Sequence, residues 1–167
     1  NAAIFSIERL DEDLDTWDST IATNLSGIYW LTKYMYSSLL DGSRIVNIAS
    51  QLGKSGRAGV APYSATKFGL IGLTKCWAKE LGARGITVNA VCPGWVRTEM
   101  TEEEVNQRAK EKNIPIDEFY NEICQPLELK RMNTVEEIAD FVEFLLSSKA
   151  AGITGRDFLL QNISNQE

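Results

Sequence analysis

Residues 50–67 read S-Q-L-G-K-S-G-R-A-G-V-A-P-Y-S-A-T-K and join a strand end, a glycine-rich loop and a helix start. Ser50 closes the apolar run at residues 45–49, which is typical of a buried strand. Tyr63 and Lys67 lie four residues apart, so their side chains share one face of a helix. The stretch therefore predicts that a hydroxyl, a phenol and an ammonium group meet at the end of a buried strand.

This trio suits proton transfer to a carbonyl oxygen. A phenol with the usual pKa near ~10 exchanges protons poorly at neutral pH, and a nearby cation lowers that pKa. Ser50 is expected to hold the substrate oxygen, Tyr63 to give it a proton, and Lys67 to lower the pKa of Tyr63. A tyrosine four residues before a lysine is also common as a solvated surface pair, which would be the favoured interpretation without the serine.

Further motifs follow the same order along the chain. The sequence has N-A-A-I at 1–4, N-L-S-G at 24–27, I-V-N-I-A-S at 45–50, Y-S-A-T-K at 63–67 and I-T-V-N-A-V-C-P-G-W-V-R-T at 86–98. In this order and spacing the motifs resemble the short-chain dehydrogenase/reductase family over nearly the whole chain. Within that family the chain is most similar to ketoreductases of the 3-oxoacyl-carrier-protein and aromatic polyketide type.

The resemblance implies a fold and an activity. It implies an α/β fold with a doubly wound, Rossmann-like parallel sheet, and hydride transfer between NAD or NADP and a carbonyl or secondary alcohol substrate. Tyr63 would be the general acid and base, Ser50 would fix the substrate oxygen, and Lys67 would also hold the nicotinamide ribose. Asn24 would kink its helix and support the proton relay through a water that leads to the lysine.

The resemblance also implies cofactor contacts after residue 92. Pro93 and Gly94 would contact the nicotinamide, and the Val96 backbone and Thr98 would lie at its carboxamide and pyrophosphate side. For Pro93 and Gly94, an ordinary turn is the alternative interpretation.

The amino-terminal residues N-A-A-I-F read as the end of a buried strand. Family members have N-N-A-G here, so Asn1 matches the second asparagine and is expected to contact the cofactor, while Ala3 replaces glycine. The family's G-x-x-x-G-x-G turn, which holds the cofactor pyrophosphate on backbone N–H groups, does not occur in this sequence. We expect residues 1–167 to form the C-terminal two thirds of one domain and to bind NAD or NADP weakly without the rest.

Hydrophobic periodicity predicts the other elements. Residues 15–40 follow a helical pattern, and one apolar stripe is expected to face the sheet: Trp17, Ile21, Leu25, Ile28, Met35 and Leu39. The remaining patterns predict strands at 44–49, 86–91 and 157–161, a helix from Pro62 to residue 81, and a helix that a capping box opens at 134–137 and that continues to residue 146.

Residues 99–126 differ from the rest of the chain. They are polar and charged, and Ile114 and Pro115 divide them into two short helical patterns. A solvated excursion and a substrate lid are both open interpretations, because lids are drawn from weakly packed segments.

The composition excludes several classes of protein. The 167 residues are 44% hydrophobic, which suits one globular domain, and no apolar stretch is long enough to cross a bilayer. The net charge of −6 argues against a nucleic-acid partner, and the absence of histidine excludes Ser-His-Asp and Cys-His mechanisms and most metal sites. Three scattered cysteines and the lack of a leader at the start predict a cytoplasmic protein without disulfides.

Two other functions fit the same residues. One is a catalytically inactive homologue that persists as a subunit or interaction module. The other is a hydrolase built on Ser50 and Lys67, which would leave Tyr63 and the Pro93-Gly94 pair unexplained.

Association is expected from second apolar faces on two helices. Trp30 and Tyr34 lie away from the stripe of their helix, and Phe68, Ile71 and Gly72 form a flatter second face on the next helix. Exposed apolar surface of this kind marks a partner site. Similar proteins pair these helices across a two-fold axis, so we expect a homodimer or homotetramer.

Overall fold

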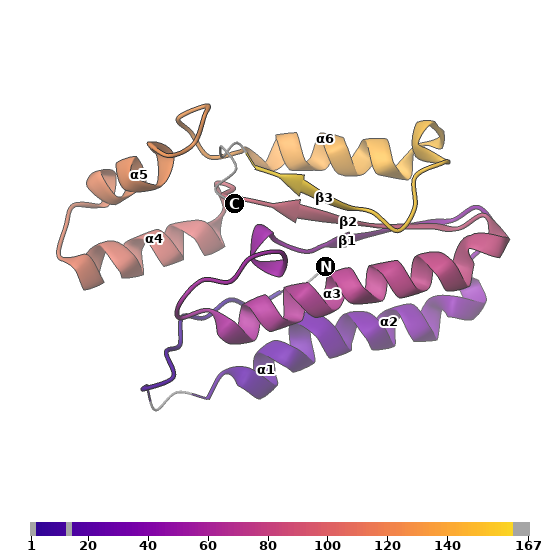
Figure 1. The fold of residues 1–167 in the computed structure, drawn as a ribbon, viewed down its shortest axis with the longest axis horizontal. Coiled ribbons are helices and arrows are strands. Elements are labelled where there is room, and N and C mark those ends of the chain that lie inside the picture. Colours follow the sequence, from indigo (N-terminus) through magenta and orange to yellow (C-terminus); the bar gives the residue numbers. More distant parts are fainter. Residues whose placement is uncertain (1–2, 13–14, 162–167) are drawn as a thin grey trace.

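A parallel β-sheet forms the centre of the chain in the computed structural model, which describes residues 3–12 and 15–161. Within these residues the strand order is β1 (Arg44–Ile48), β2 (Thr87–Pro93) and β3 (Asp157–Leu160) (Figure 1). Both strand pairs are parallel, with Val46 beside Asn89 and Val91 beside Phe158. Helices cover both faces of the sheet, so the predicted doubly wound α/β fold is confirmed (Figure 1).

One face of the sheet carries α3 (Ala61–Leu81), with α1 (Trp17–Ile21) and α2 (Gly27–Met35) packed beyond it (Figure 1). Successive side chains of a strand point to opposite faces. Val88, Ala90 and Cys92 of β2 are accordingly fully buried on the α3 side, against α3 residues that include Leu70, Ile71, Trp77 and Leu81. This packing holds α3, which carries Tyr63 and Lys67, against the sheet.

The other face carries α6 (Val135–Leu146). Thr134 and Glu137 form the predicted capping box, in which each side chain accepts a hydrogen bond from the backbone N–H of the other residue. Val91 and Leu145 are fully buried between α6 and the sheet.

Beyond the carboxyl ends of the strands lie α4 (Glu99–Lys112) and α5 (Ile116–Cys124) (Figure 1). The predicted division near Pro115 is confirmed, because α5 begins at the following residue. The two helices have a small core of their own: Val105, Ala109, Phe119 and Met132. Short turns complete the described elements: a π-helical turn at Ala22–Ser26 and 3-10 turns at Tyr36–Ser38, Gln51–Gly53, Gly82–Arg84 and Ser148–Ala150.

The predicted strand at residues 1–5 is wrong for its described part, residues 3–5, where the structure has no strand. Instead, the side-chain amide of Asn24 pairs with the backbone of Ile4. Its Oδ1 accepts from the Ile4 N–H at 2.8 Å, and its Nδ2 donates to the Ile4 carbonyl at 2.8 Å. A buried side chain thus satisfies the two groups that a neighbouring strand would otherwise satisfy.

The predicted apolar stripe of residues 15–40 is only partly correct. Ile28 and Leu39 pack on the core, but Trp17 and Met35 are about half exposed. The hydrogen bonds of the π-helical turn at Ala22–Ser26 span one residue more than those of an α-helix, so the turn rotates the helix faces on its two sides relative to each other. A stripe with the regular α-helical period therefore cannot continue across it.

We expect Asn24→Asp to lower the free energy of unfolding by about 2 kcal/mol, because the buried carboxylate cannot donate to the Ile4 carbonyl. Urea denaturation measures the change. The matched control is Asn121→Asp on the exposed side of α5, which should change the free energy by less than about 0.5 kcal/mol. Equal effects of the two substitutions would contradict a structural role for the Asn24 amide.

None of the described helices is both long and apolar enough to cross a membrane.

Candidate functional site

A small pocket of about 80 Å³ lies where the ends of β1 and β2 meet the loop after Ser50 and the start of α3. We call it the inner pocket. Its lining is Phe5, Ser50, Gln51, Leu52, Arg57, Tyr63, Gly94, Trp95, Met100, Thr101 and Glu104. The pocket brings together Ser50, Tyr63 and Gly94, three of the residues that the sequence singles out.

Ser50 is held in a fixed orientation at the end of β1. Its backbone is extended, and its Oγ accepts a hydrogen bond from the Leu52 N–H at 3.1 Å. A hydroxyl that accepts in this way keeps its own hydrogen to donate. The Ser50 hydroxyl lies close enough to Tyr63 to lower the pKa of the phenol through a hydrogen bond.

Tyr63 is buried, and its ring packs edge-on against Phe5 with the ring centroids 5.0 Å apart. Burial raises the pKa of Tyr63, because a phenolate is poorly solvated there, and the opposing effect of Ser50 is smaller. The expected lowering of this pKa by Lys67 is therefore not found. The charged groups that act on the phenol are Glu104, which raises its pKa, and Arg57, which lowers it.

Lys67 lies one helical turn further along α3 and is only 3% exposed. Its Nζ donates to the Ile48 carbonyl at 2.9 Å and lies 5.3 Å from the centroid of the Tyr63 ring. This placement turns the ammonium toward the end of β1 and explains its weak effect on the phenol. Burial lowers the pKa of Lys67 to about 8.

The depressed pKa of Lys67 predicts a pH-dependent stability. Between pH 8 and the usual lysine value of 10.5, the unfolded chain binds more protons at this residue than the folded chain. The free energy of unfolding that Lys67 contributes should therefore rise with pH across that window. Denaturant titrations give the free energy of unfolding of the unmodified chain and of Lys67→Met. The value for the unmodified chain minus the value for Lys67→Met should rise from pH 8 to pH 10. A difference that does not change with pH would contradict the burial of a titrating ammonium.

Gly53 lets the loop approach the backbone of α3. A Cβ at this position would lie 2.8 Å from the carbonyl carbon and oxygen of Lys67, which is closer than real Cβ atoms come to backbone. The glycine of this loop thus has a packing role that fixes the distance between the loop and Lys67.

Asn24 is fully buried in the π-helical turn, and its amide bonds Ile4 rather than a residue of the inner pocket. Its observed role is to hold residues 3–5, which include the Phe5 that packs on Tyr63. The part in a proton relay that the family resemblance implies for Asn24 stays a prediction.

A second hollow, an open groove of about 650 Å³, lies at the edge of the sheet beside α6. Pro93, Val96 and Thr98 line this sheet-edge groove together with Ile48 and, from α6, Val135, Ile138, Ala139, Asp140, Val142, Glu143 and Leu146. Gly94 lies next to it, where a Cβ would come within 2.8 Å of the Gln161 Cβ. Asn1, the remaining predicted cofactor contact, lies outside the described residues.

The groove suits the nicotinamide end of a dinucleotide. Its floor is apolar where Ile48, Pro93 and Val96 line it, and Thr98 places a hydroxyl at the start of α4. A flat aromatic ring with a polar substituent fits such a surface. The Lys67 ammonium donates to the carbonyl of Ile48, a residue that also lines the groove, and lies 5.3 Å from the centroid of the Tyr63 ring.

The sequence reasoning missed two charged residues of the inner pocket. The Arg57 Nη2 lies 2.6 Å from the Glu104 Oε1, so the loop after Ser50 is tied to α4 by an ion pair. The position of Arg57 in the predicted active-site loop was a usable signal. Glu104 gave none, because it stands in the run T-E-E-E-V, which has the pattern of a solvated helix face.

A family model and two related proteins match this chain over most of its length. A family model described as enoyl-(acyl carrier protein) reductase matches residues 1–161. The chain is 38% identical over 164 residues to the uncharacterized oxidoreductase YxjF of Bacillus subtilis, covering 96% of this chain and 64% of that protein. It is 42% identical over 148 residues to a 3-oxoacyl-(acyl-carrier-protein) reductase of Synechocystis sp., covering 87% of this chain and 54% of that protein.

Solved structures share the fold over nearly the whole chain. A variant of actinorhodin polyketide ketoreductase with NADPH superposes with a TM-score of 0.88 at 35% identity, covering 97% of this chain and 64% of that one. A 4-hydroxyisoleucine dehydrogenase complexed with NADH gives 0.81 at 32% identity, covering 96% and 64%. The chain spans 54% to 64% of the length of these four proteins.

Proposed function

This chain belongs to the short-chain dehydrogenase/reductase family, and from that premise we propose that the protein containing it transfers hydride between a nicotinamide cofactor and a carbonyl or secondary alcohol carbon. One observation carries the proposal: Ser50 and Tyr63 share one pocket, and the Lys67 ammonium, 5.3 Å from the Tyr63 ring centroid, donates to the carbonyl of Ile48, a residue of the sheet-edge groove. This arrangement supports proton transfer at the place where a hydride donor would meet a carbonyl.

In the direction of reduction, the bound cofactor supplies the hydride that the carbonyl carbon takes up. Ser50 donates a hydrogen bond to the carbonyl oxygen and holds it beside Tyr63. Tyr63 gives its phenolic proton to that oxygen as the C=O double bond becomes a C–OH single bond. Since burial keeps Tyr63 protonated at neutral pH, the residue is ready to act as an acid.

Lys67 belongs to the cofactor side of the site in this proposal. Its ammonium is 5.3 Å from the centroid of the phenol ring and is shielded from water, but it is turned toward the end of β1. We assign Lys67 the role of binding the nicotinamide ribose, because it donates to the carbonyl of Ile48, which lines the groove.

For the substrate class and the cofactor, the relatives guide the proposal. The similar proteins include a 3-oxoacyl-(acyl-carrier-protein) reductase and a polyketide ketoreductase, so we propose a ketone on an acyl group as substrate. One similar structure holds NADPH and another holds NADH, and both cofactors belong in the test.

The segment 99–126 serves as a substrate lid in this proposal. From α4 it contributes Met100, Thr101 and Glu104 to the inner pocket, and Val105, Ala109 and Phe119 pack its two helices against each other.

The proposal is tested by following the absorbance of NADPH or NADH with the protein containing this chain and small 3-oxo esters. Consumption of cofactor that matches the alcohol formed is the expected result. Ester hydrolysis without cofactor consumption would favour the Ser50 and Lys67 hydrolase instead, and neither reaction would favour an inactive homologue.

We also propose self-association through α2 and α3. Trp30, Tyr34 and Phe68 are 46%, 76% and 49% exposed, and the rings of Trp30 and Tyr34 stack 6.0 Å apart. The expectation that Ile71 shares this face is wrong, because Ile71 is buried in the core with Leu70. A homodimer or homotetramer would cover the exposed rings.

Replacing Trp30 by glutamate should dissociate this assembly, because the charge would be buried in an apolar contact. Sedimentation at micromolar concentration is expected to give an oligomer for the unmodified protein and a monomer for Trp30→Glu. The control is Phe144→Glu, at a partly exposed position on α6, away from α2 and α3. A monomeric unmodified protein would contradict the proposal.

A further inference from the structure

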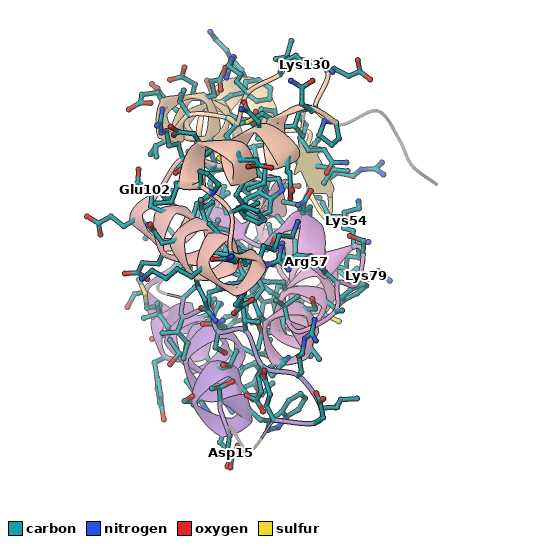
Figure 2. The ribbon with its side chains drawn as sticks, turned by 90° about the vertical axis from the view of Figure 1, so that its left-hand side faces the viewer. Asp15, Lys54, Arg57, Lys79, Glu102 and Lys130 are labelled. Carbon is teal, nitrogen blue, oxygen red and sulfur yellow. The ribbon has the colours of Figure 1, made fainter. Side chains whose placement is uncertain are left out.

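Arg57 stands at the junction of two cavities. It lines the inner pocket and also a larger groove of about 670 Å³, which we call the outer groove and which lies between residues 8–12, Trp17 and Pro62. Figure 2 shows Arg57 near the middle of the face that is turned toward the viewer. A substrate that reaches Tyr63 with a substituent in the outer groove would therefore pass Arg57.

The Arg57 side chain is held rather than free. Its guanidinium pairs with Glu104 at 2.6 Å and lies 5.5 Å from the Trp95 ring centroid and 6.0 Å from the Phe5 ring centroid. The side chains of Arg57 and Glu104 are only 23% and 8% exposed. The carboxylate offsets the charge of the Arg57 guanidinium, although Arg108 lies 3.7 Å from the same carboxylate, so the junction attracts an anion less than an unpaired Arg57 would.

One of these donors has no acceptor. Among the residues that the structure describes, none accepts from the buried Arg57 Nε–H. Buried donors without a partner are rare, since they lose the hydrogen bond that water would give them. The Nε atom itself is closed off from solvent, so a substrate oxygen at the junction would accept from the part of the guanidinium that lines the two cavities.

We propose that Arg57 is the residue that selects the substrate, by donating to a second, uncharged oxygen next to the reacting carbonyl, while Glu104 holds its guanidinium and offsets its charge. The inference rests on the proposed function and adds to it a preference among ketone substrates. The site should favour a ketone that carries an ester or thioester carbonyl over a ketone without a second oxygen. Glu104 should also weaken the binding of a ketone that carries a free carboxylate, because its negative charge offsets that of Arg57.

The first test compares ethyl acetoacetate with a ketone of the same length that lacks the ester oxygens. The quantity compared is kcat/KM for the ester divided by kcat/KM for the plain ketone. Arg57→Met removes the donor and should lower this ratio by about tenfold or more. The matched control is Arg108→Met, which removes the other arginine near Glu104, 3.7 Å away, and should move the ratio by less than about twofold. An unchanged ratio in Arg57→Met would overturn the proposal.

The second test removes the balancing charge. In Glu104→Gln the guanidinium keeps its full charge, so the ratio of kcat/KM for acetoacetate, the free carboxylate, to that for ethyl acetoacetate should rise about tenfold. A ratio that stays constant or falls would overturn the assigned role of Glu104.

Binding gives a readout that does not depend on turnover. Calorimetric titration with ethyl acetoacetate should give a Kd about tenfold weaker in Arg57→Met than in the unmodified protein, and equal values would overturn the proposal. If the unmodified protein binds the ester through Arg57 but reduces no ketone, the proposed reductase function fails while the assignment of Arg57 stands.

Discussion

Tyr63→Phe should lower kcat for ketone reduction by about a thousandfold in the protein containing this chain, because it removes the proton donor. The substitution deletes one oxygen atom and keeps the ring that packs edge-on against Phe5. The substrate oxygen would still be held by Ser50, so the loss should lie in kcat rather than in KM. Initial rates over a range of ketone concentrations separate the two constants.

The interpretation requires that Tyr63→Phe leaves the fold and the sheet-edge groove intact. Thermal unfolding should give a Tm within about 3 °C of the unmodified protein, since the buried ring is retained. Nicotinamide fluorescence should give a similar Kd for the cofactor in both proteins. A kcat that falls by less than about tenfold would contradict the role of Tyr63 as general acid.

Ser50→Ala should lower kcat by about a hundredfold, because the substrate oxygen loses the donor that holds it beside Tyr63. The change also removes the acceptor of the Leu52 N–H, so a modest loss of stability is expected as well. Ser50→Thr keeps a hydroxyl at the same position and should recover most of the activity. Recovery separates the hydrogen bond to substrate from a general disturbance of the loop.

The two substitutions also discriminate against a hydrolase. A nucleophilic Ser50 with Lys67 as base would lose all covalent chemistry in Ser50→Ala and would be nearly insensitive to Tyr63→Phe. The reductase should be more sensitive to Tyr63→Phe than to Ser50→Ala, because only Tyr63 supplies the proton. The opposite order of effects would favour the hydrolase.

Elements with strong local signals could be predicted from the sequence. The capping box of Thr134 and Glu137 marks the start of α6, and β2, which is buried from Thr87 to Cys92, coincides with the strand predicted at residues 86–91. The meeting of Ser50 and Tyr63 was predictable because a strand end and the next helix start are close in the chain.

Other features depend on contacts between distant residues. The Asn24 amide replaces a neighbouring strand for Ile4, and the π-helical turn rotates the face of the helix, so periodicity misplaces residues 3–5 and Trp17. The ion pair of Arg57 and Glu104 joins residues 47 positions apart, and nothing in the local sequence distinguishes Glu104 from its solvated neighbours.

The electrostatics of Tyr63 also escaped the sequence reasoning. The spacing of Tyr63 and Lys67 suggests that the cation lowers the pKa of the phenol. In the fold, burial has the larger effect and raises that pKa, while the ammonium is turned toward Ile48. The degree of burial depends on how Phe5 and the loop close over the ring, which spacing alone does not determine.

The central claim is hydride transfer to a carbonyl carbon, and isotope transfer tests it most directly. The protein containing this chain is incubated with ethyl acetoacetate and a reduced nicotinamide cofactor in which deuterium replaces both hydrogens on the reactive ring carbon, and the product is analysed by mass spectrometry and NMR. Our account predicts an alcohol with one deuterium on the carbon that bears the new hydroxyl. With Tyr63→Phe it predicts almost no alcohol in the same time. An alcohol without deuterium, or acetoacetate and ethanol as the products, would contradict it.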